Sequence, residues 1–220
     1  GTIDARDFKT MRDEMPMLAN IDLSAATISA YTGSEGTYST GAYSYPANTL
    51  SRNALYKKTT LKSIKLPADL TSIGRSALNS CTALTTITIP SSVVLIDSMA
   101  FRACTALKMI NIPASVRTIG YAALSYSGLT NIVLPNGVTT IGDYAFNACT
   151  ALKKINIPAS VQTIGYAAFC YSDLTDIVLP NGVTTIGDYA FQNCASLSSV
   201  SIPSTVTHSG YCAFTFDNAL

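Results

Sequence analysis

The hydrophobic positions of this chain recur with a nearly fixed period. A phrase of the form L-x-x-I-x-[I/L]-P begins at Leu61, Leu84, Leu107, Leu129, Leu152, Leu174 and Leu197. Self-similarity at a period of about 20 to 50 residues is the sequence signature of stacked repeats. We therefore predict that residues 61–220 form seven regular repeats of one continuous solenoid.

Each repeat contains a strand pattern followed by a more apolar segment. In one copy Ile110 and Ile112 flank Asn111, which is the alternation of a half-buried strand. Pro113 then ends the strand because it has no N–H for a further ladder bond. The following segment, V-x-x-I-G and then Ala-Phe or Ala-Leu, supplies a small residue where coils approach and a large one for the interior.

Glycine follows an apolar residue in most repeats, at positions 74, 120, 142, 165, 187 and 210. We expect a tight bend with positive φ there, because glycine adopts that conformation at little steric cost. Asp97 takes this position in one repeat. Aspartate tolerates left-handed geometry, so it fits the same expectation.

The whole unit, L-x-x-I-x-I-P-x-x-V-x-x-I-G-x-x-A-F-x-x-C, resembles the BspA-like, or treponemal-type, leucine-rich repeat. The resemblance covers Leu61 to Leu220. It implies a right-handed coil with a repeat of about 22–23 residues, mostly β, with a parallel sheet on one face and short helical or 3-10 turns. It also implies a secreted or surface-anchored protein that binds host or neighbouring-cell proteins. A parallel β-helix of the polysaccharide-lyase kind is the structural alternative.

The two ends of the chain differ from the regular repeats. Asp4 to Met15 has the pattern of an amphipathic helix that Pro16 stops, so we assign residues 1–17 to an N-terminal capping helix. Residues 18–60 are an irregular first repeat with a Tyr, Gly and Ser-rich insertion near residues 32–44. Helix and first repeat would shield the apolar end of the stack, as terminal repeats must.

The C-terminal end shows no comparable cap. Ser209 replaces the isoleucine that precedes glycine elsewhere, which predicts a wetter final coil, and Leu220 aligns with the first leucine of another repeat. Either the native chain continues, or this end packs on a partner, which includes self-association with a second copy.

Composition narrows the class of partner. Apolar residues make up 48% of the chain and charged residues 12%, with a formal net charge of +1. Such a balance gives no field to attract nucleic acid or an anionic membrane, and no apolar stretch approaches the roughly 18 to 20 residues of a spanning helix. The N-terminus has neither a basic start nor an apolar core, so we expect that any secretion signal has been removed.

Four cysteines share one slot, three residues after the large residue of each pair. They are Cys81, Cys104, Cys149 and Cys194. A recurrent slot favours free thiols that pack as small apolar groups. Cys81 and Cys104 alone lie on adjacent coils, within reach of a disulfide. No C-x-x-C spacing typical of zinc ligands is present, so we expect neither a metal site nor a cofactor.

The chain offers little that suggests catalysis. His208 is the one histidine, and Asp143 and Asp188 share a repeat position two coils apart. Strand spacing puts these carboxylates roughly 10 Å apart, against about 5 to 9.5 Å in glycosidases. Both follow a turn glycine on the outer side, where we expect neither burial nor a charged neighbour. We expect no catalytic residues and no enzymatic activity.

Tyrosines and basic residues form two further groups. Tyr121, Tyr166 and Tyr211 share one repeat position, and Tyr144 and Tyr189 share the next. We interpret them as outer-face filler, with sugar binding as the alternative. The basic group gathers near the first regular repeats and is interpreted as a solvated face, with partner docking as the alternative. Its members are Arg52, Lys57, Lys58, Lys62, Lys65 and Arg75.

The outward positions of the strand phrase are the predicted binding surface. They are small, polar or mildly apolar and form an extended, shallow surface, which suits a protein or a polymer. The partner-binding residues we predict there are Lys65, Thr88, Met109, Asn111, Asn131, Val133, Lys154, Asn156, Asp176 and Val178. Tyr38 and Tyr43 of the insertion are added, because we expect the insertion to overhang one edge of that sheet.

Three functions are compatible with these features. The leading one is a non-catalytic adhesion or protein-interaction module whose partner is an extracellular or cell-surface protein, such as a matrix protein, or a glycan. The second is carbohydrate binding through the tyrosine rows. The third is polysaccharide lyase or hydrolase chemistry on a β-helix, which would need clustered carboxylates or basic residues on one strand face.

Overall fold

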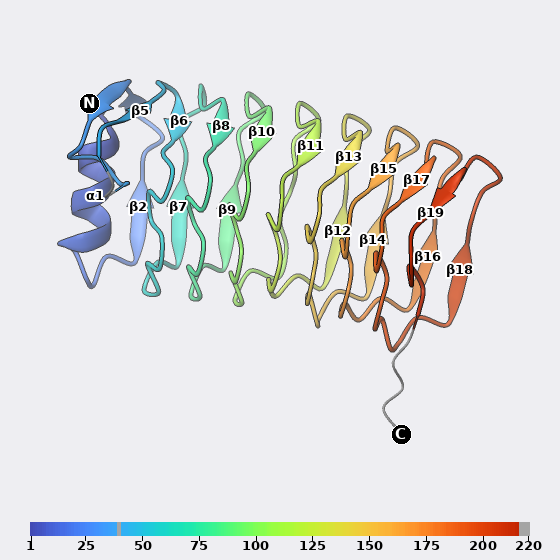
Figure 1. The fold of residues 1–220 in the computed structure, drawn as a ribbon. Helices are drawn as coiled ribbons and strands as arrows, with labels where there is room; N and C mark the ends of the chain where they lie inside the picture. The colour runs from blue at the N-terminus through green and yellow to red at the C-terminus, as the bar shows by residue number, and fades with distance from the viewer. Residues whose placement is uncertain (39–40, 216–220) are drawn as a thin grey trace.

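A computed structural model describes residues 1–38 and 41–215 of the chain. The repeats stack as the coils of a β-solenoid of about nine turns, with one short helix at the N-terminal end (Figure 1). The fold class predicted from the repeat is confirmed: strands run parallel from coil to coil, and the described chain is mostly strand and turn. Each coil has three sides, and each side has a different pattern of backbone hydrogen bonds to the next coil.

The L-x-x-I-x-[I/L]-P phrases form the first side, called here the long-strand face. Its three-residue strands are β2 (Asn20–Asp22), β7 (Ser63–Lys65), β9 (Thr86–Thr88), β12 (Asn131–Val133), β14 (Lys154–Asn156), β16 (Asp176–Val178) and β18 (Ser199–Ser201). They pair in parallel as β2-β7-β9, β12-β14 and β16-β18. Between β9 and β12 the ladder is reduced to one bridge, from Thr88 to Asn111. In most of these strands the middle residue is buried and its two neighbours face out, as in β9 around Ile87.

The V-x-x-I segments form a second side, the short-strand face, which is one continuous sheet. Its eight strands bond in the order β19-β17-β15-β13-β11-β10-β8-β6. They are β6 (Thr49–Leu50), β8 (Ser72–Ile73), β10 (Leu95–Ile96), β11 (Thr118–Ile119), β13 (Thr140–Ile141), β15 (Thr163–Ile164), β17 (Thr185–Ile186) and β19 (His208–Ser209). Figure 1 shows the two sets of strands running along different sides of the coil. The structure therefore has two parallel faces, and the shorter strands form the unbroken one.

Hydrogen-bonded turns form the third side, the turn face. The Leu78 N–H donates to the Ala100 carbonyl of the next coil at 2.9 Å, while the Ala77 N–H closes a turn on the Gly74 carbonyl at 3.0 Å. This alternation requires left-handed backbone at two positions per coil, such as Ser76 (φ 54°) and Ser80 (φ 62°). The turn face is thus bonded between coils almost as regularly as a sheet.

The repeat glycines are required because neighbouring coils leave no room for a Cβ, and not because their backbone is left-handed. Among the described residues the glycine with positive φ is Gly41. The positive φ predicted for the repeat glycines is therefore wrong, and so is the left-handed geometry expected of Asp97. A Cβ at Gly74 would lie 2.7 Å from the Leu50 carbonyl oxygen, and one at Gly165 would lie 2.6 Å from the Asp143 nitrogen. Neighbouring coils approach closely at this corner, which is why the position favours glycine.

The interior is a column of stacked side chains. The rings of Phe146, Phe169 and Phe191 stack with centroids 5.2 and 5.1 Å apart and planes within 6° of parallel. In the cysteine slot, the Cys104 thiol donates to the carbonyl oxygen of Leu78 in the preceding coil at 3.2 Å. All six cysteines are free thiols. A coil with cysteine in this slot therefore packs on the preceding coil through both apolar area and a sulfur hydrogen bond.

The N-terminal segment covers the first coil. Helix α1 (Ala5–Asp13) is capped by Asp4 and buries Ala5 and Phe8, in agreement with the predicted capping helix. Lys58 is buried beneath it, and its ammonium donates to the carbonyl oxygens of Met15 and Arg12. The remaining strands belong to this end: β1 (Thr2–Ile3) pairs with β3 (Thr27–Ile28), and β4 (Tyr31–Gly33) with β5 (Tyr43–Tyr45).

The last described coil is more exposed than the others. All three residues of β18 and both of β19 are exposed, whereas the corresponding middle position of β16 is buried. Ile202 is 50% exposed. The wetter final coil predicted from Ser209 is present, while Leu220 lies outside the described residues.

Candidate functional site

The long-strand face gathers the predicted sheet residues on one surface. All ten are exposed on its outer side, and the pairing aligns them in two rows. Lys65 lies opposite Thr88, Asn131 opposite Lys154, and Val133 opposite Asn156. The remaining members are Met109, Asn111, Asp176 and Val178. This side-by-side placement is what a contact surface for an extended partner needs.

Exposed apolar side chains interrupt this polar surface. Met109, Val133 and Val178 are each 68% exposed. Beside Met109 the break in the ladder leaves a shallow groove of about 280 Å³ between the coils of Ile87 and Ile110. Apolar side chains exposed this fully are costly in water and become favourable when a partner covers them.

Charge on the long-strand face is local. The Lys65 ammonium lies 2.8 Å from an Asp22 carboxylate oxygen. This lysine and the hydrogen bonds from Ser24 hold the pKa of Asp22 well below its usual range, and Asp22 in turn raises the pKa of Lys65. Both side chains are more than half exposed, so solvent screens the pair. Lys65 is therefore one half of an exposed ion pair.

The insertion lies elsewhere than predicted. Its strands β4 and β5 form an antiparallel hairpin. Tyr43 and Tyr45 of the hairpin line a pocket together with Thr49, Ser72 and Leu95, which belong to the short-strand face. The expectation that the insertion overhangs the long-strand sheet is therefore wrong. The extra length of the first repeat changes the position of the loop around the coil, which a repeat alignment does not reveal.

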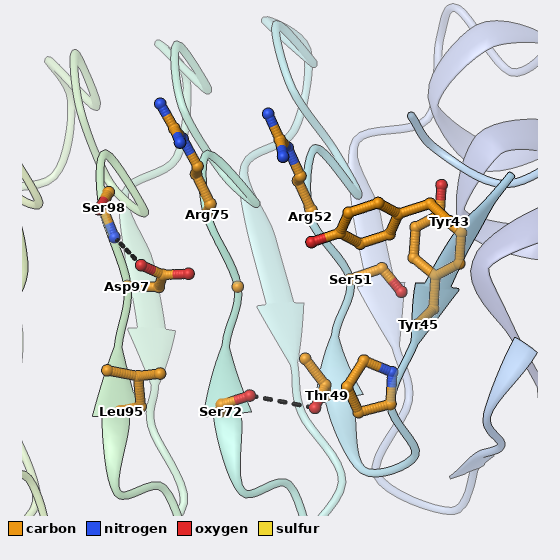
Figure 2. A pocket seen from close by; sticks show the side chains of 12 residues that line it. Tyr43, Tyr45, Thr49, Ser51, Arg52, Ser72, Arg75, Leu95, Asp97 and Ser98 are labelled. Atoms are coloured by element: carbon orange, nitrogen blue, oxygen red, sulfur yellow. Dashed lines mark hydrogen bonds between the residues drawn. The ribbon is translucent and has the colours of Figure 1, made fainter. Parts of the chain in front are cut away.

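This hairpin pocket has a volume of about 380 Å³. Aromatic, polar and charged side chains line it (Figure 2). Tyr45 is buried and stacks on Tyr31 at 5.9 Å between ring centroids. Tyr43, 37% exposed, contacts Tyr45 edge-on at 5.1 Å. Arg52, Arg75 and Asp97 line the pocket as well. Tyr38 lies beside it, with the Arg52 guanidinium 3.9 Å from its ring centroid.

The basic group predicted from the sequence is not one surface. Arg52 and Arg75 lie in the hairpin pocket, whereas Lys65 faces out from the long-strand face. Lys58 is 4% exposed, so the interpretation as a solvated face is wrong for this residue. Burial lowers the pKa of Lys58, the nearby Asp13 opposing that effect. The pairing of Arg52 with Arg75 has a sequence signal, since the two arginines lie one full repeat apart along the chain.

The two tyrosine rows merge into one ladder at the edge of the turn face. Neighbouring ring centroids along it lie 5.2 to 5.6 Å apart, with planes tilted by 55° to 82°. In chain order the ladder is Tyr121, Tyr144, Tyr166, Tyr189 and Tyr211. In the sequence these tyrosines fall at two different repeat positions because alternate repeats differ slightly in length. Two shallow cavities of about 400 and 180 Å³ lie beside the ladder.

The two aspartates considered for catalysis, Asp143 and Asp188, form hydrogen bonds between coils, and His208 lies on the last short strand. Asp143 accepts the Tyr166 N–H at 2.8 Å, and Asp188 accepts the Tyr211 N–H at 2.7 Å. These carboxylates hold the next coil in place. His208 is exposed on β19. Within residues 1–38 and 41–215, no three His, Cys, Asp or Glu side chains form a group that would hold a metal ion.

No helix in the described part of the chain is long and apolar enough to cross a membrane. A search of curated proteins found no match. The family model for the BspA type leucine rich repeat region matches residues 48–174 and 118–219, with six copies.

Solved structures show the same fold. A leucine-rich repeat protein from Bacteroides ovatus is 28% identical, with a TM-score of 0.72 over 87% of this chain and 48% of that one. The Treponema pallidum leucine-rich repeat protein is 28% identical, with a TM-score of 0.54 over 75% of this chain and 67% of that one. This chain therefore spans about half the length of the Bacteroides protein.

Proposed function

Because the chain belongs to the BspA-type leucine-rich repeat family, we propose that it is a non-catalytic adhesion or protein-binding module that acts in secreted form or at the cell surface. Its binding surface is the long-strand face. The observation that carries this proposal is the set of three exposed apolar residues, Met109, Val133 and Val178, within two aligned rows of polar side chains.

This surface has the composition of a protein interface. Interfaces combine an apolar centre with a polar rim that supplies hydrogen bonds. Val133 provides apolar area, and Asn131 and Asn156 near it provide donors and acceptors. The shallow shape suits an extended partner better than a small molecule, which needs a concave cavity. Solenoids typically bind through such long regular surfaces.

Short-range contacts must dominate recognition on this face. The chain has a formal net charge of +1, so it offers little long-range attraction to a partner. The partner we propose is an extracellular or cell-surface protein, matrix proteins included. Its affinity should change little with ionic strength, because shape and hydrogen bonds carry it.

The test removes the apolar centre while preserving shape. The protein is immobilised and titrated with purified matrix proteins and with cell-surface proteins, and the affinity of each binder is measured. In the variant Met109→Gln, Val133→Thr, Val178→Thr we expect binding to weaken by about tenfold or more, since buried apolar area is lost. Val94→Thr, at a residue 54% exposed outside the long-strand face, is the matched control. A triple variant that binds every partner as tightly as the wild type contradicts the proposal.

Carbohydrate binding through the tyrosine ladder is the second candidate. It is supported by the continuity of the five rings and by the cavities beside them. Tyrosine offers apolar area and one hydroxyl, which suits a sugar ring. Glycan binding measured alongside the protein titrations separates the two functions, because Tyr166→Ala should abolish glycan binding and leave the long-strand face unchanged.

A further inference from the structure

The hairpin pocket places two like charges side by side. Arg52 and Arg75 occupy one repeat position on adjacent coils, and the Asn53 N–H bonds to the Arg75 carbonyl at 3.0 Å. Figure 2 shows both side chains running in parallel in the same direction. Neither arginine forms an ion pair with an acidic side chain among the described residues. Adjacent like charges are unfavourable unless an anion joins them.

Arg52 also has an unmet hydrogen-bonding requirement. Its Nε is buried and has no hydrogen-bond partner in the described structure. The guanidinium lies 3.9 Å from the ring centroid of Tyr38 and 5.8 Å from that of Tyr43. Stacking on tyrosine fixes the plane of the guanidinium and leaves its edge for an acceptor. A buried donor without an acceptor costs free energy, which a bound oxyanion would recover.

Asp97 limits what kind of anion the pocket accepts. It lines the pocket on the coil after Arg75, and its Oδ1 accepts the Ser98 N–H at 2.5 Å. A carboxylate in this place repels a dianionic phosphate or a densely sulfated chain more than it repels a single carboxylate. Its second oxygen is an acceptor for a donor on the ligand, such as a peptide N–H.

We propose that the hairpin pocket binds an acidic side chain of a peptide ligand, with Arg52 and Arg75 holding the carboxylate and Asp97 accepting a neighbouring peptide N–H. Planar guanidinium forks match a carboxylate in geometry as well as in charge. This site lies on a different side of the coil from the long-strand face. It rests on the proposed function only in taking the ligand to be a peptide.

Contacts that do not involve the Arg52 side chain also hold the hairpin. The Arg12 guanidinium donates to the carbonyl oxygens of Thr37 at 2.8 Å and Asn53 at 2.9 Å. The Thr37 hydroxyl donates to the backbone carbonyl of Arg52, which a substitution keeps. We therefore expect Arg52→Gln to remove the charge while these other contacts keep the hairpin beside the pocket.

The test uses a fluorescein-labelled peptide of alternating glutamate and glycine, with fluorescence anisotropy at low ionic strength as the readout. We expect Arg52→Gln and Arg75→Gln each to weaken binding by about tenfold, as for loss of one charge-assisted hydrogen-bonded contact. Arg117→Gln removes an exposed arginine outside the pocket and should leave affinity unchanged. A glutamine-glycine peptide should not bind.

Three outcomes overturn the proposal. One is the absence of peptide binding, and another is equal weakening by Arg117→Gln, which would indicate general attraction by positive charge. The third is tighter binding of a heparin oligosaccharide or of inorganic phosphate with the same dependence on Arg52 and Arg75. In addition, Asp97→Asn should improve binding of phosphate relative to the peptide, and an unchanged ratio contradicts the role given to Asp97.

Failure of this site and failure of the long-strand face are distinguishable. The triple variant at Met109, Val133 and Val178 should bind the acidic peptide as the wild type does. If that variant also keeps every protein partner while the arginine variants lose the peptide, the long-strand proposal fails and the pocket stands. If the arginine variants keep the peptide while the triple variant loses its partner, the reverse holds.

Discussion

A cysteine side chain shows how one residue joins two coils. The Cys81 thiol donates to the Leu55 carbonyl at 3.1 Å, and Cys149 and Cys194 make the corresponding bonds to Leu124 and Phe169 at 3.2 Å. Burial raises the pKa of Cys81 to about 12 and that of Cys149 to about 11. These thiols stay protonated at neutral pH, which makes them packing groups and weak donors instead of nucleophiles.

The raised pKa values predict a loss of stability in alkali. Below pH 9.0, the ordinary thiol value, folded and unfolded chains are both protonated. Between pH 9 and about 11 the unfolded chain loses protons that the folded chain keeps, so the free energy of unfolding should fall by about 1 kcal/mol per pH unit for each thiol. Urea unfolding at pH 8 and pH 10 measures this.

The control replaces the four slot cysteines with serine, the residue that the slot already holds at Ser127 and Ser172. Serine does not titrate in this range. The free energy of unfolding of the variant should therefore fall less between pH 8 and pH 10, and the fall that remains is the contribution of lysine and tyrosine. Equal slopes in the two proteins would contradict the assignment of the effect to these thiols.

At the scale of elements, two arginines of the helix contact the hairpin or the loop within it. Arg12 near the end of α1 pairs with Asp13 and reaches the carbonyl oxygens of Thr37 and Asn53. The Arg6 guanidinium also lies 4.7 Å from the ring centroid of Tyr31 in β4. The capping helix therefore does more than cover the first coil, because it also positions the hairpin that forms one wall of the pocket.

Removing the hydrogen bonds of Arg12 should loosen the hairpin. We expect Arg12→Gln to lower the free energy of unfolding by about 1 to 3 kcal/mol, since two charge-assisted hydrogen bonds to backbone oxygens are lost. Hydrogen exchange should increase at residues 31–38 and 43–45 and stay unchanged in the central coils. Lys9→Gln on the same helix, at an exposed residue, is the control. Unchanged exchange in the hairpin would contradict the role of Arg12.

At the scale of the whole molecule, stability is distributed along a stack. Each coil contacts mainly its two neighbours, so the energetic effect of a substitution depends on its place in the column. Phe169 has stacked rings on both sides, Phe146 and Phe191. Phe214 stacks on Phe191, at 5.1 Å between centroids, and is only partly buried.

Position in the stack predicts unequal effects of one substitution. We expect Phe169→Ala to lower the free energy of unfolding by about 3 to 5 kcal/mol, as for a buried phenylalanine that leaves a cavity. Phe214→Ala should cost clearly less, because it disturbs one interface at the wetter end. Chemical denaturation of the two variants measures the difference. Equal costs would show that the coils do not act as a nearest-neighbour stack.

Much of the fold is visible in the sequence because it repeats a local pattern. Alternation around Asn111 identifies the long strands, the Asp4 to Met15 pattern identifies the helix, and the Phe and Cys slots identify the interior. Each of these depends on whether a side chain points inward or outward within its own coil. The same repeat position points inward or outward in every coil. The core residues and the exposed rows can therefore be predicted without knowing how the coils contact one another.

Features that depend on the distance between coils needed the tertiary structure. The close approach at Gly74, the interleaving of Tyr121 and Tyr144 in one ladder, and the position of the hairpin are of this kind. The sequence by itself determined that the chain is a solenoid and which residues of the long strands face out. Only the tertiary structure decided which outward residues meet, because the unequal lengths of alternate repeats and a long insertion shift side chains between coils.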